Sequence, residues 1–185
     1  EEMYPDGFST WIQPPRVAEL LEGVFRPGHF RGVATIVLKL FQMVQPQRAY
    51  FGEKDAQQLA IIRRLVSDFN LPIDIIEVPT VREGDGLAMS SRNRNLSGGE
   101  RRLAVSLYYA LMEAKRRIES GERSASAVAR AAAATIPSSD SLRLEYLEIV
   151  DPVNMQPVDD IDGPVRVAGA LWVGSTRLID NLLVS

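Results

Sequence analysis

Three groups of residues in this sequence have side chains and a spacing suited to binding an anion. The first is Gly52–Gln58, which lies where a short apolar run at Arg48–Gly52 ends and a helical pattern begins. Ligands of open α/β sheets bind beyond the carboxyl ends of parallel strands, and free N–H groups at a helix N-terminus attract anions. Gly52 allows close backbone approach and Lys54 adds positive charge, so the segment suggests a phosphate-binding turn. A solvated helix cap is the alternative, and the Walker spacing of Gly, Lys and Ser/Thr is absent.

The second group is Met89–Asn93, and the third is Arg26–Val33, which contains Arg26 and His29. The hydroxyls of Ser90 and Ser91, together with the guanidinium of Arg92, suit a polyphosphate. Taken alone, this segment is better explained as a polar linker. Arg26, His29 and the nearby Arg31 precede or begin a helical pattern and could bind an anionic substrate there, although a packing role is the stronger alternative for His29.

Composition excludes several classes of protein. The 185 residues include 21 Lys and Arg against 24 Asp and Glu, so the net charge of −3 creates no basic field for nucleic acid. The absence of cysteine excludes a disulfide framework, a cysteine-ligated zinc site and a thiol nucleophile. The only histidine, His29, excludes a scheme that needs two from this chain. We expect no membrane partner, since no apolar run approaches about 20 residues, and a cytoplasmic location, since no signal peptide is evident.

Hydrophobic periodicity predicts a βαβ unit in the first part of the chain. Apolar residues spaced i, i+3, i+4 and i+7 predict a helix over Gly28–Gln45 and a second over Asp55–Asn70. Short apolar runs predict strands at Arg48–Gly52 and Ile73–Val78, which should be parallel because a helix connects them. Phe8–Gln13 is a further strand candidate. We expect residues 1–80 to be the second half of a Rossmann-like nucleotide-binding domain.

The remaining residues, 81–185, are expected to form a small α+β lid domain after a polar boundary near Thr80. Ser97 lies three residues before Glu100, which is a capping-box pattern, and the helix it begins should run to Gly121. Ser124 should cap a second helix that runs to Ile136. Strands are then predicted at three places: Leu142–Val150, Val165–Val173 and Leu178–Val184. The fold class is therefore α/β with parallel strands, followed by an α+β domain.

Several long motifs agree in order and spacing with one family. They are Arg26–Val33, Tyr50–Gln58, Val78–Ala88 and Met89–Asn93, with weaker similarity at Tyr4-Pro5 and Ser175–Asn181. Together they closely resemble the pantothenate synthetase family, over nearly all of Met3–Asn181. The resemblance implies a Rossmann-like nucleotidyltransferase domain with a smaller C-terminal lid, usually in a homodimer. It also implies that ATP and pantoate give pantoyl adenylate and pyrophosphate, and that β-alanine then displaces AMP to give pantothenate.

The resemblance also implies site residues. Those that would contact ATP are Gly52, Glu53, Lys54, Asp55, Val81, Met89, Ser90, Ser91 and Arg92, and Gln58 would hold pantoate. Lys54, Ser90 and Arg92 would stabilise charge as pyrophosphate leaves. Mg²⁺ should bridge the ATP phosphates with few protein ligands, so no dedicated metal site is expected. Further candidates are Arg26, His29, Met3 and Phe51.

The sequence differs from the family in one large feature, which affects whether these residues alone are expected to be active. The family's first portion, with its first strand and a His-x-Gly-His motif, has no counterpart here, and His29 belongs to a different family position. We therefore expect these residues alone to be an inactive fragment that exposes a sheet edge. The alternatives are another adenylate-forming nucleotidyltransferase or an inert structural fragment. Nucleic-acid binding through Arg92, Arg94, Arg101 and Arg102 fits poorly with the net charge of −3, so no nucleic-acid partner is expected.

Overall fold

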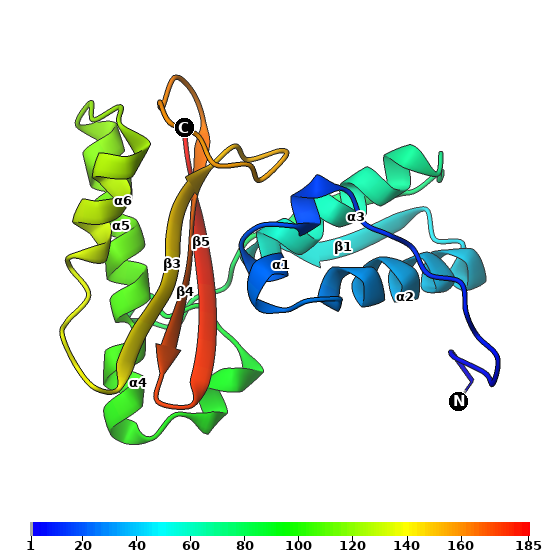
Figure 1. Ribbon diagram of the computed structural model, residues 1–185, viewed down its shortest axis with the longest axis horizontal. Helices are drawn as coiled ribbons and strands as arrows, with labels where there is room; N and C mark the ends of the chain where they lie inside the picture. The colour runs from blue at the N-terminus through cyan, green and yellow to red at the C-terminus, as the bar shows by residue number, and fades with distance from the viewer. Residues whose placement is uncertain (1) are drawn as a thin grey trace. The chain divides into compact units, whose positions relative to one another are not determined.

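The computed structural model describes residues 2–185, and the chain divides into two compact units (Figure 1). Unit 1 ends at Val78, and unit 2 spans Pro79–Ser185. Each has its own sheet. The sheet of unit 1 has two strands and the sheet of unit 2 has three.

Unit 1 contains the expected βαβ arrangement. The strands β1 (Arg48–Gly52) and β2 (Asp74–Val78) are parallel, and α3 (Ala56–Asp68) connects them. The long helix α2 (His29–Val44) precedes them, after the short elements η1 (Arg16–Ala18) and α1 (Glu22–Phe25). The predicted helices and the parallel pairing are thus confirmed, with ends that differ by at most two residues.

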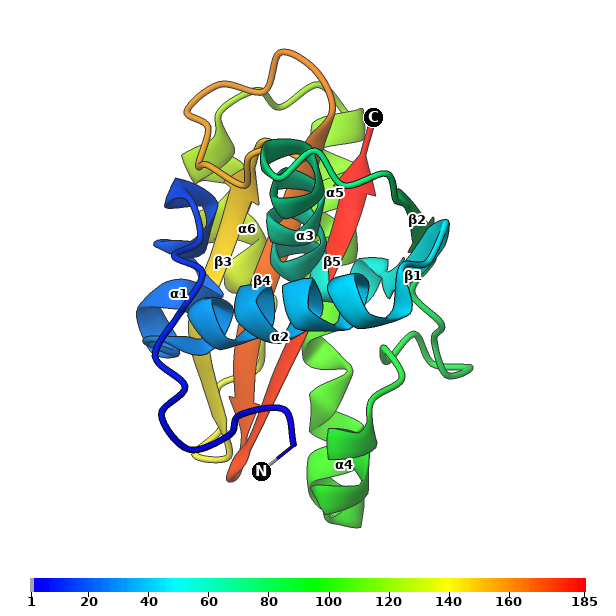
Figure 2. The same cartoon turned by 90° about the vertical axis from the view of Figure 1, so that its right-hand side faces the viewer.

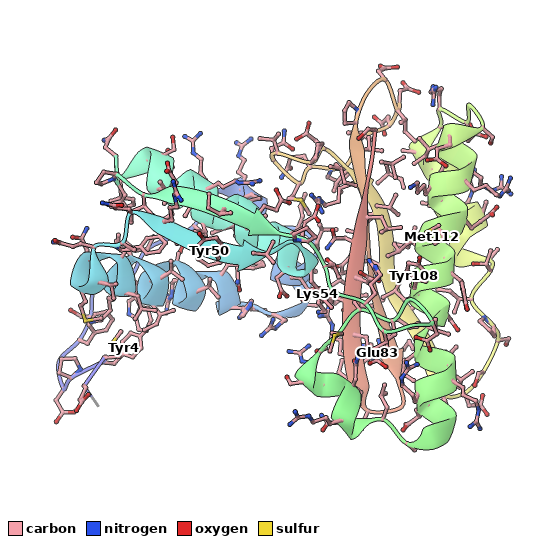
Figure 3. The ribbon with its side chains drawn as sticks, turned by 180° about the vertical axis from the view of Figure 1, so that it is seen from behind. Tyr4, Tyr50, Lys54, Glu83, Tyr108 and Met112 are labelled. Carbon is pink, nitrogen blue, oxygen red and sulfur yellow. The ribbon has the colours of Figure 1, made fainter. Side chains whose placement is uncertain are left out.

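Apolar side chains of both long helices pack on one face of this parallel pair. Phe41 of α2, Ile62 and Leu65 of α3, and Ile73 form the buried centre. Successive residues of a strand point to opposite faces, so Ala49, Phe51 and Ile75 reach this core from the sheet. Tyr50 lies on the other face and is 64% exposed (Figure 3).

The prediction of a strand at Phe8–Gln13 is wrong, because this segment has irregular backbone structure. Its aromatic side chains pack on one another instead. The ring of Phe8 meets those of Tyr4 and Trp11 edge-on at 5.0 and 5.2 Å between centroids. The N–H of Ile12 donates to the hydroxyl of Thr35 on α2 at 3.0 Å rather than to a neighbouring strand. A short segment of this kind forms a strand only where a partner strand is present to pair with its backbone.

Unit 2 packs helices against an antiparallel sheet, whose strands run side by side in Figure 2. The strands are β3 (Leu142–Val150), β4 (Val165–Val173) and β5 (Thr176–Val184), in the order β3-β4-β5. The helices are α4 (Gly98–Ala104), α5 (Ser106–Glu119) and α6 (Ala125–Ala133), and a 3₁₀ turn, η3 (Ser91–Asn95), precedes them. The mixed α/β class, with one parallel pair and a separate antiparallel sheet, is as expected.

The helix predicted from Ser97 to Gly121 is two helices. The capping box forms as expected, since the Ser97 hydroxyl accepts from the N–H of Glu100 and the Glu100 carboxylate accepts from the N–H of Ser97. The helix then ends at Ala104, and Val105, with a ψ of −13°, separates α4 from α5. Neither Gly nor Pro lies at the break, so residue type gives no signal of it. The apolar stripe nevertheless continues through both helices, since Ala104 of α4 and Leu107 and Leu111 of α5 are buried.

Candidate functional site

In unit 1 the first candidate segment lies at a strand-to-helix junction. Gly52 ends β1, Glu53–Asp55 form a 3₁₀ turn, and α3 begins at Ala56. Asp55 occupies the N-cap position of α3 but makes no side-chain capping hydrogen bond. The first N–H groups of a helix lack partners within it and attract negative charge. Lys54, labelled in Figure 3, is part of this turn and adds a positive charge to it, so the residue types at the junction suit an anion.

The two adjacent glutamines of α3 have different environments. Gln57 is only 4% exposed and binds three backbone groups of the preceding segment. Its Oε1 accepts from the N–H of Glu22 at 3.0 Å, and its Nε2 donates to the carbonyls of Val17 and Leu20 at 2.6 and 2.7 Å. Gln58 is partly exposed beside the junction. Gln57 therefore supports the fold, whereas Gln58, which is partly exposed, stays a prediction as a ligand-binding residue.

Arg26 and His29 lie together at the start of α2. Arg26 Nη1 is 2.9 Å from His29 Nε2 and 4.0 Å from the Glu22 carboxylate. Arg26 lines a pocket of about 260 Å³ with Gly28 and other residues, but His29 does not line it. The remaining candidates of unit 1 lie elsewhere: Met3 is in the irregular N-terminal segment, and Phe51 packs in the core, 6.4 Å from the Phe41 ring.

In unit 2 the Met89–Arg92 segment follows a tight hairpin. The N–H of Met89 donates to the carbonyl of Val81 at 2.9 Å, and Arg82 bridges to Ala88 in antiparallel fashion. At its turn, Gly86 has a φ of +96°, and a Cβ there would lie 2.1 Å from a ring carbon of Tyr108. The hairpin thus sits directly on α5, which fixes where the candidate segment begins.

Met89, Ser90 and Ser91 of the candidate segment line a pocket of about 620 Å³ in unit 2, but Arg92 does not. The residues that line it are Glu83, Met89, Ser90, Ser91, Asn93, Arg94 and Arg101. The hydroxyl of Ser90 accepts from the N–H of Arg92 at 3.2 Å and so caps η3. Arg92 has five N–H donors and uses one of them on the carbonyl of Arg177 in β5, at 3.2 Å. Arg94, also in η3, lines the pocket.

Two polar contacts of this region were missed by sequence reasoning. Arg82 makes a bidentate ion pair with the buried Asp180 of β5 at 2.6 and 2.9 Å, and its guanidinium stacks 4.7 Å from the Tyr108 ring. Arg101 of α4 reaches the carboxylates of both Glu83 and Asp85 at 2.7 Å. The partners of the first contact lie 98 positions apart, so no local pattern could have revealed it.

Arg101 sets the protonation of its two partners. Its hydrogen bond is the main reason that the pKa of Glu83 is lowered, with Asn93 second, and it also lowers the pKa of Asp85. Both carboxylates are therefore charged at neutral pH. Residues 2–185 contain no group of three or more His, Cys, Asp or Glu side chains that could hold a metal ion. Over the same residues, no helix is long and apolar enough to span a membrane.

The structure thus collects the candidates into two groups. Unit 1 brings Gly52–Asp55 and Gln58 to one strand-to-helix junction, with Arg26 and His29 at a second helix start. Unit 2 brings Val81 and Met89–Arg92 to one hairpin and the turn that follows it.

Comparisons with known proteins agree on a single family. The family model for pantoate-beta-alanine ligase matches residues 1–183. A pantothenate synthetase of Thermosipho africanus is 50% identical over 184 residues, which cover 100% of this chain and 66% of that protein. A crystal structure of pantothenate synthetase from Thermus thermophilus superposes with a TM-score of 0.92 at 46% identity, over 98% of this chain and 66% of that one.

A second solved structure was determined with ligands. It is the pantoate-beta-alanine ligase of Francisella tularensis, complexed with beta-gamma ATP and beta-alanine. It superposes with a TM-score of 0.71 at 35% identity, over 98% of this chain and 60% of that one. The chain described here therefore spans about two thirds or slightly less of the length of these relatives.

Proposed function

The chain belongs to the pantoate–β-alanine ligase family, and we propose on that premise that the protein containing it joins pantoate to β-alanine using ATP. The observation that carries the proposal is the family match over residues 1–183. It is supported by the anion-binding geometry at the two candidate segments, Gly52–Asp55 and Met89–Arg92. Another adenylate-forming nucleotidyltransferase would use similar phosphate contacts, but the family match favours the pantoate ligase.

The proposed reaction has two steps. In the first, a carboxylate oxygen of pantoate attacks the α-phosphorus of ATP, and the bond from that phosphorus to the β-phosphate bridge breaks, releasing pyrophosphate. In the second, the amine of β-alanine attacks the acyl carbon of pantoyl adenylate. The acyl–oxygen bond breaks, AMP leaves, and the amine loses a proton as the amide forms. Negative charge accumulates on the departing phosphates in the first step, so fixed positive groups there accelerate it.

Unit 1 would supply one part of the ATP site. We assign ATP contacts to Gly52, Glu53, Lys54 and Asp55, where the N-terminus of α3 and the Lys54 ammonium both favour negative charge. Gln58 would bind pantoate, because its amide can donate to a carboxylate and accept from a hydroxyl.

Unit 2 would supply the remaining contacts, from Val81, Met89, Ser90, Ser91 and Arg92. Ser90 and Arg92, together with Lys54 of unit 1, would stabilise the leaving pyrophosphate. Mg²⁺ would accompany ATP and neutralise phosphate charge, held mainly by phosphate oxygens and water.

The two units would have different roles in the enzyme. In the proposal, unit 1 is part of a Rossmann-like nucleotide-binding domain and unit 2 is its lid. The complete enzyme would be a cytoplasmic homodimer.

The proposal is tested by assaying the full-length protein for pantoate-dependent pyrophosphate release and for pantothenate. Lys54→Ala should lower the rate of pyrophosphate release about 100- to 1,000-fold, because removing one preformed transition-state contact has this effect in other enzymes. Its stability should be reduced far less than its rate. Lys115→Ala is the matched control, since Lys115 pairs with Glu119 on the exposed side of α5. Equal rates in the two variants would refute the role of Lys54, and a wild-type protein that forms no pantothenate would refute the proposed activity.

A further inference from the structure

A chain of polar contacts connects α4 to the segment that precedes and forms η3. It begins at Arg101, whose Nη2 donates to Oε2 of Glu83 at 2.7 Å. The other carboxylate oxygen, Oε1 of Glu83, accepts from Nδ2 of Asn93 at 3.1 Å. Both oxygens of one carboxylate are thus used, one toward the helix and one toward the turn. We call Arg101, Glu83 and Asn93 the clasp.

Asn93 carries the clasp into the candidate phosphate-binding segment. Its amide nitrogen has two hydrogens, and the second contact of Nδ2 is to the carbonyl of Ala88 at 3.1 Å. Its backbone N–H donates to the carbonyl of Ser90 at 3.1 Å. Asn93 therefore contacts both ends of Ala88–Ser90, the stretch that carries Ser90 and precedes Ser91 and Arg92.

Arg101 also fixes the hairpin on the other side of the clasp. Its Nη1 donates to Oδ2 of Asp85 at 2.7 Å and its Nη2 to Oδ1 at 3.0 Å. Asp85 Oδ1 in turn accepts from the N–H of Leu87 at 3.3 Å. One guanidinium on a helix thus braces two points of the hairpin, and its planar fork of donors suits this geometry better than a lysine would.

The clasp residues line the same pocket of about 620 Å³ as Ser90 and Ser91. An uncompensated Glu83 carboxylate in that wall would repel an anionic ligand. Arg101 offsets this charge as well as holding the carboxylate in place. The clasp therefore has a positional effect and an electrostatic effect on the same pocket.

We propose that Arg101 and Asn93 are positioning residues, which act through Glu83 to hold the Met89–Arg92 segment in the conformation that receives the ATP phosphates. The proposal rests on the proposed function, because that function supplies the phosphates. Neither residue touches the reacting atoms in this role. Loss of the clasp should therefore weaken ATP binding and leave the pantoate site of unit 1 unchanged.

The test compares Arg101→Gln with Arg102→Gln in the full-length enzyme. Arg102 is the next residue of α4 and is exposed, so the two variants share the substitution and the change in net charge. Arg101→Gln should raise the ATP KM about tenfold, the size expected for a lost hydrogen bond to a charged group, with the pantoate KM unchanged. A merely structural role would lower the active fraction, and hence kcat, without separating the two KM values. In an active enzyme, an ATP KM equal to that of Arg102→Gln overturns the proposal.

Two further variants separate the positional and electrostatic effects. Asn93→Ala removes both contacts of the amide nitrogen while leaving the Glu83–Arg101 pair, and it should also raise the ATP KM. Glu83→Gln added to Arg101→Gln should recover part of the loss, because it removes the uncompensated charge. If the double variant is no better than Arg101→Gln and Asn93→Ala equals the wild type, the clasp has no role in ATP binding.

A measurement that does not depend on activity tests the clasp separately from the proposed function. Amide hydrogen exchange of Met89–Arg92 in the ligand-free protein should be faster in Arg101→Gln and Asn93→Ala than in Arg102→Gln. If the wild-type protein makes no pantothenate, the proposed function is refuted and these exchange rates decide the clasp. Faster exchange then supports it as a device that orders the segment, and equal exchange overturns it.

Discussion

Gln57 and Gln58 are adjacent in the first turn of α3, and replacing each with alanine should have opposite consequences. The Gln57 side chain is buried and makes three hydrogen bonds to the backbone between Val17 and Glu22. These bonds tie that backbone, which includes parts of η1 and α1, to α3. Gln57→Ala should therefore destabilise unit 1, and Gln58→Ala should weaken pantoate binding with little effect on stability.

The size of the effect follows from the contacts. Each net hydrogen bond contributes about 1 kcal/mol, so losing three costs about 3 kcal/mol, and more if the carbonyls of Val17 and Leu20 stay buried without partners. For a protein of this length, each kcal/mol lowers the melting temperature by about 2–4 °C, which gives a decrease of about 6–12 °C for Gln57→Ala. Gln58→Ala should stay within about 0.5 kcal/mol of the wild type.

The comparison is well controlled because both variants exchange glutamine for alanine in the same turn of the same helix. Any gain in helix propensity is common to both and cancels. The free energy of unfolding is measured by urea titration, and the pantoate KM is measured at a temperature where both variants remain folded. Equal unfolding free energies for the two variants would refute the assignment of Gln57 to the fold. A pantoate KM raised by Gln57→Ala and unaffected by Gln58→Ala would reverse both roles.

Three further predictions concern charge and the extent of the chain. Gln58→Glu should raise the pantoate KM more than the ATP KM, because it places a carboxylate beside an anionic substrate; equal changes in the two steady-state constants would count against the pantoate role. The hydrogen bonds from Arg116 and Arg117 lower the pKa of Glu113 from 4.5 to about 2. The ion pairs of the Glu113 carboxylate therefore stabilise the folded state fully above about pH 4.5, and this stabilisation is lost as the pH falls toward 2. The difference in melting temperature between wild type and Glu113→Gln should therefore shrink over that range, and a difference that is constant with pH would show that the charge is not responsible. Residues 1–185 expressed alone should form no measurable pantothenate when assayed with ATP, pantoate and β-alanine. Pantothenate formation by these residues would overturn the expectation that the family's His-x-Gly-His portion is needed.

Local sequence pattern was enough to predict the elements whose formation depends on nearby residues. The helices at His29–Val44 and Ala56–Asp68 have apolar stripes at the helical period, and their ends agree with the prediction within two residues. The parallel pairing of β1 with β2 followed from the helix that connects them, because a strand–helix–strand connection leaves little topological choice. The capping box at Ser97 and Glu100 was also predicted, since both of its hydrogen bonds join residues only three positions apart.

Features that depend on packing between distant parts of the chain could not be predicted from local sequence. They include the different roles of adjacent residues and the contacts between residues far apart in the chain. Gln57 and Gln58 are identical in type, but the direction of a side chain from a helix depends on what the helix packs against, so only the fold buried the first. The Phe8–Gln13 pattern suits a strand, yet the segment packs its aromatic rings on one another because strand pairing requires a neighbour that no local pattern supplies. Arg82 and Asp180 lie 98 positions apart and meet only because the hairpin that carries Arg82 packs against β5.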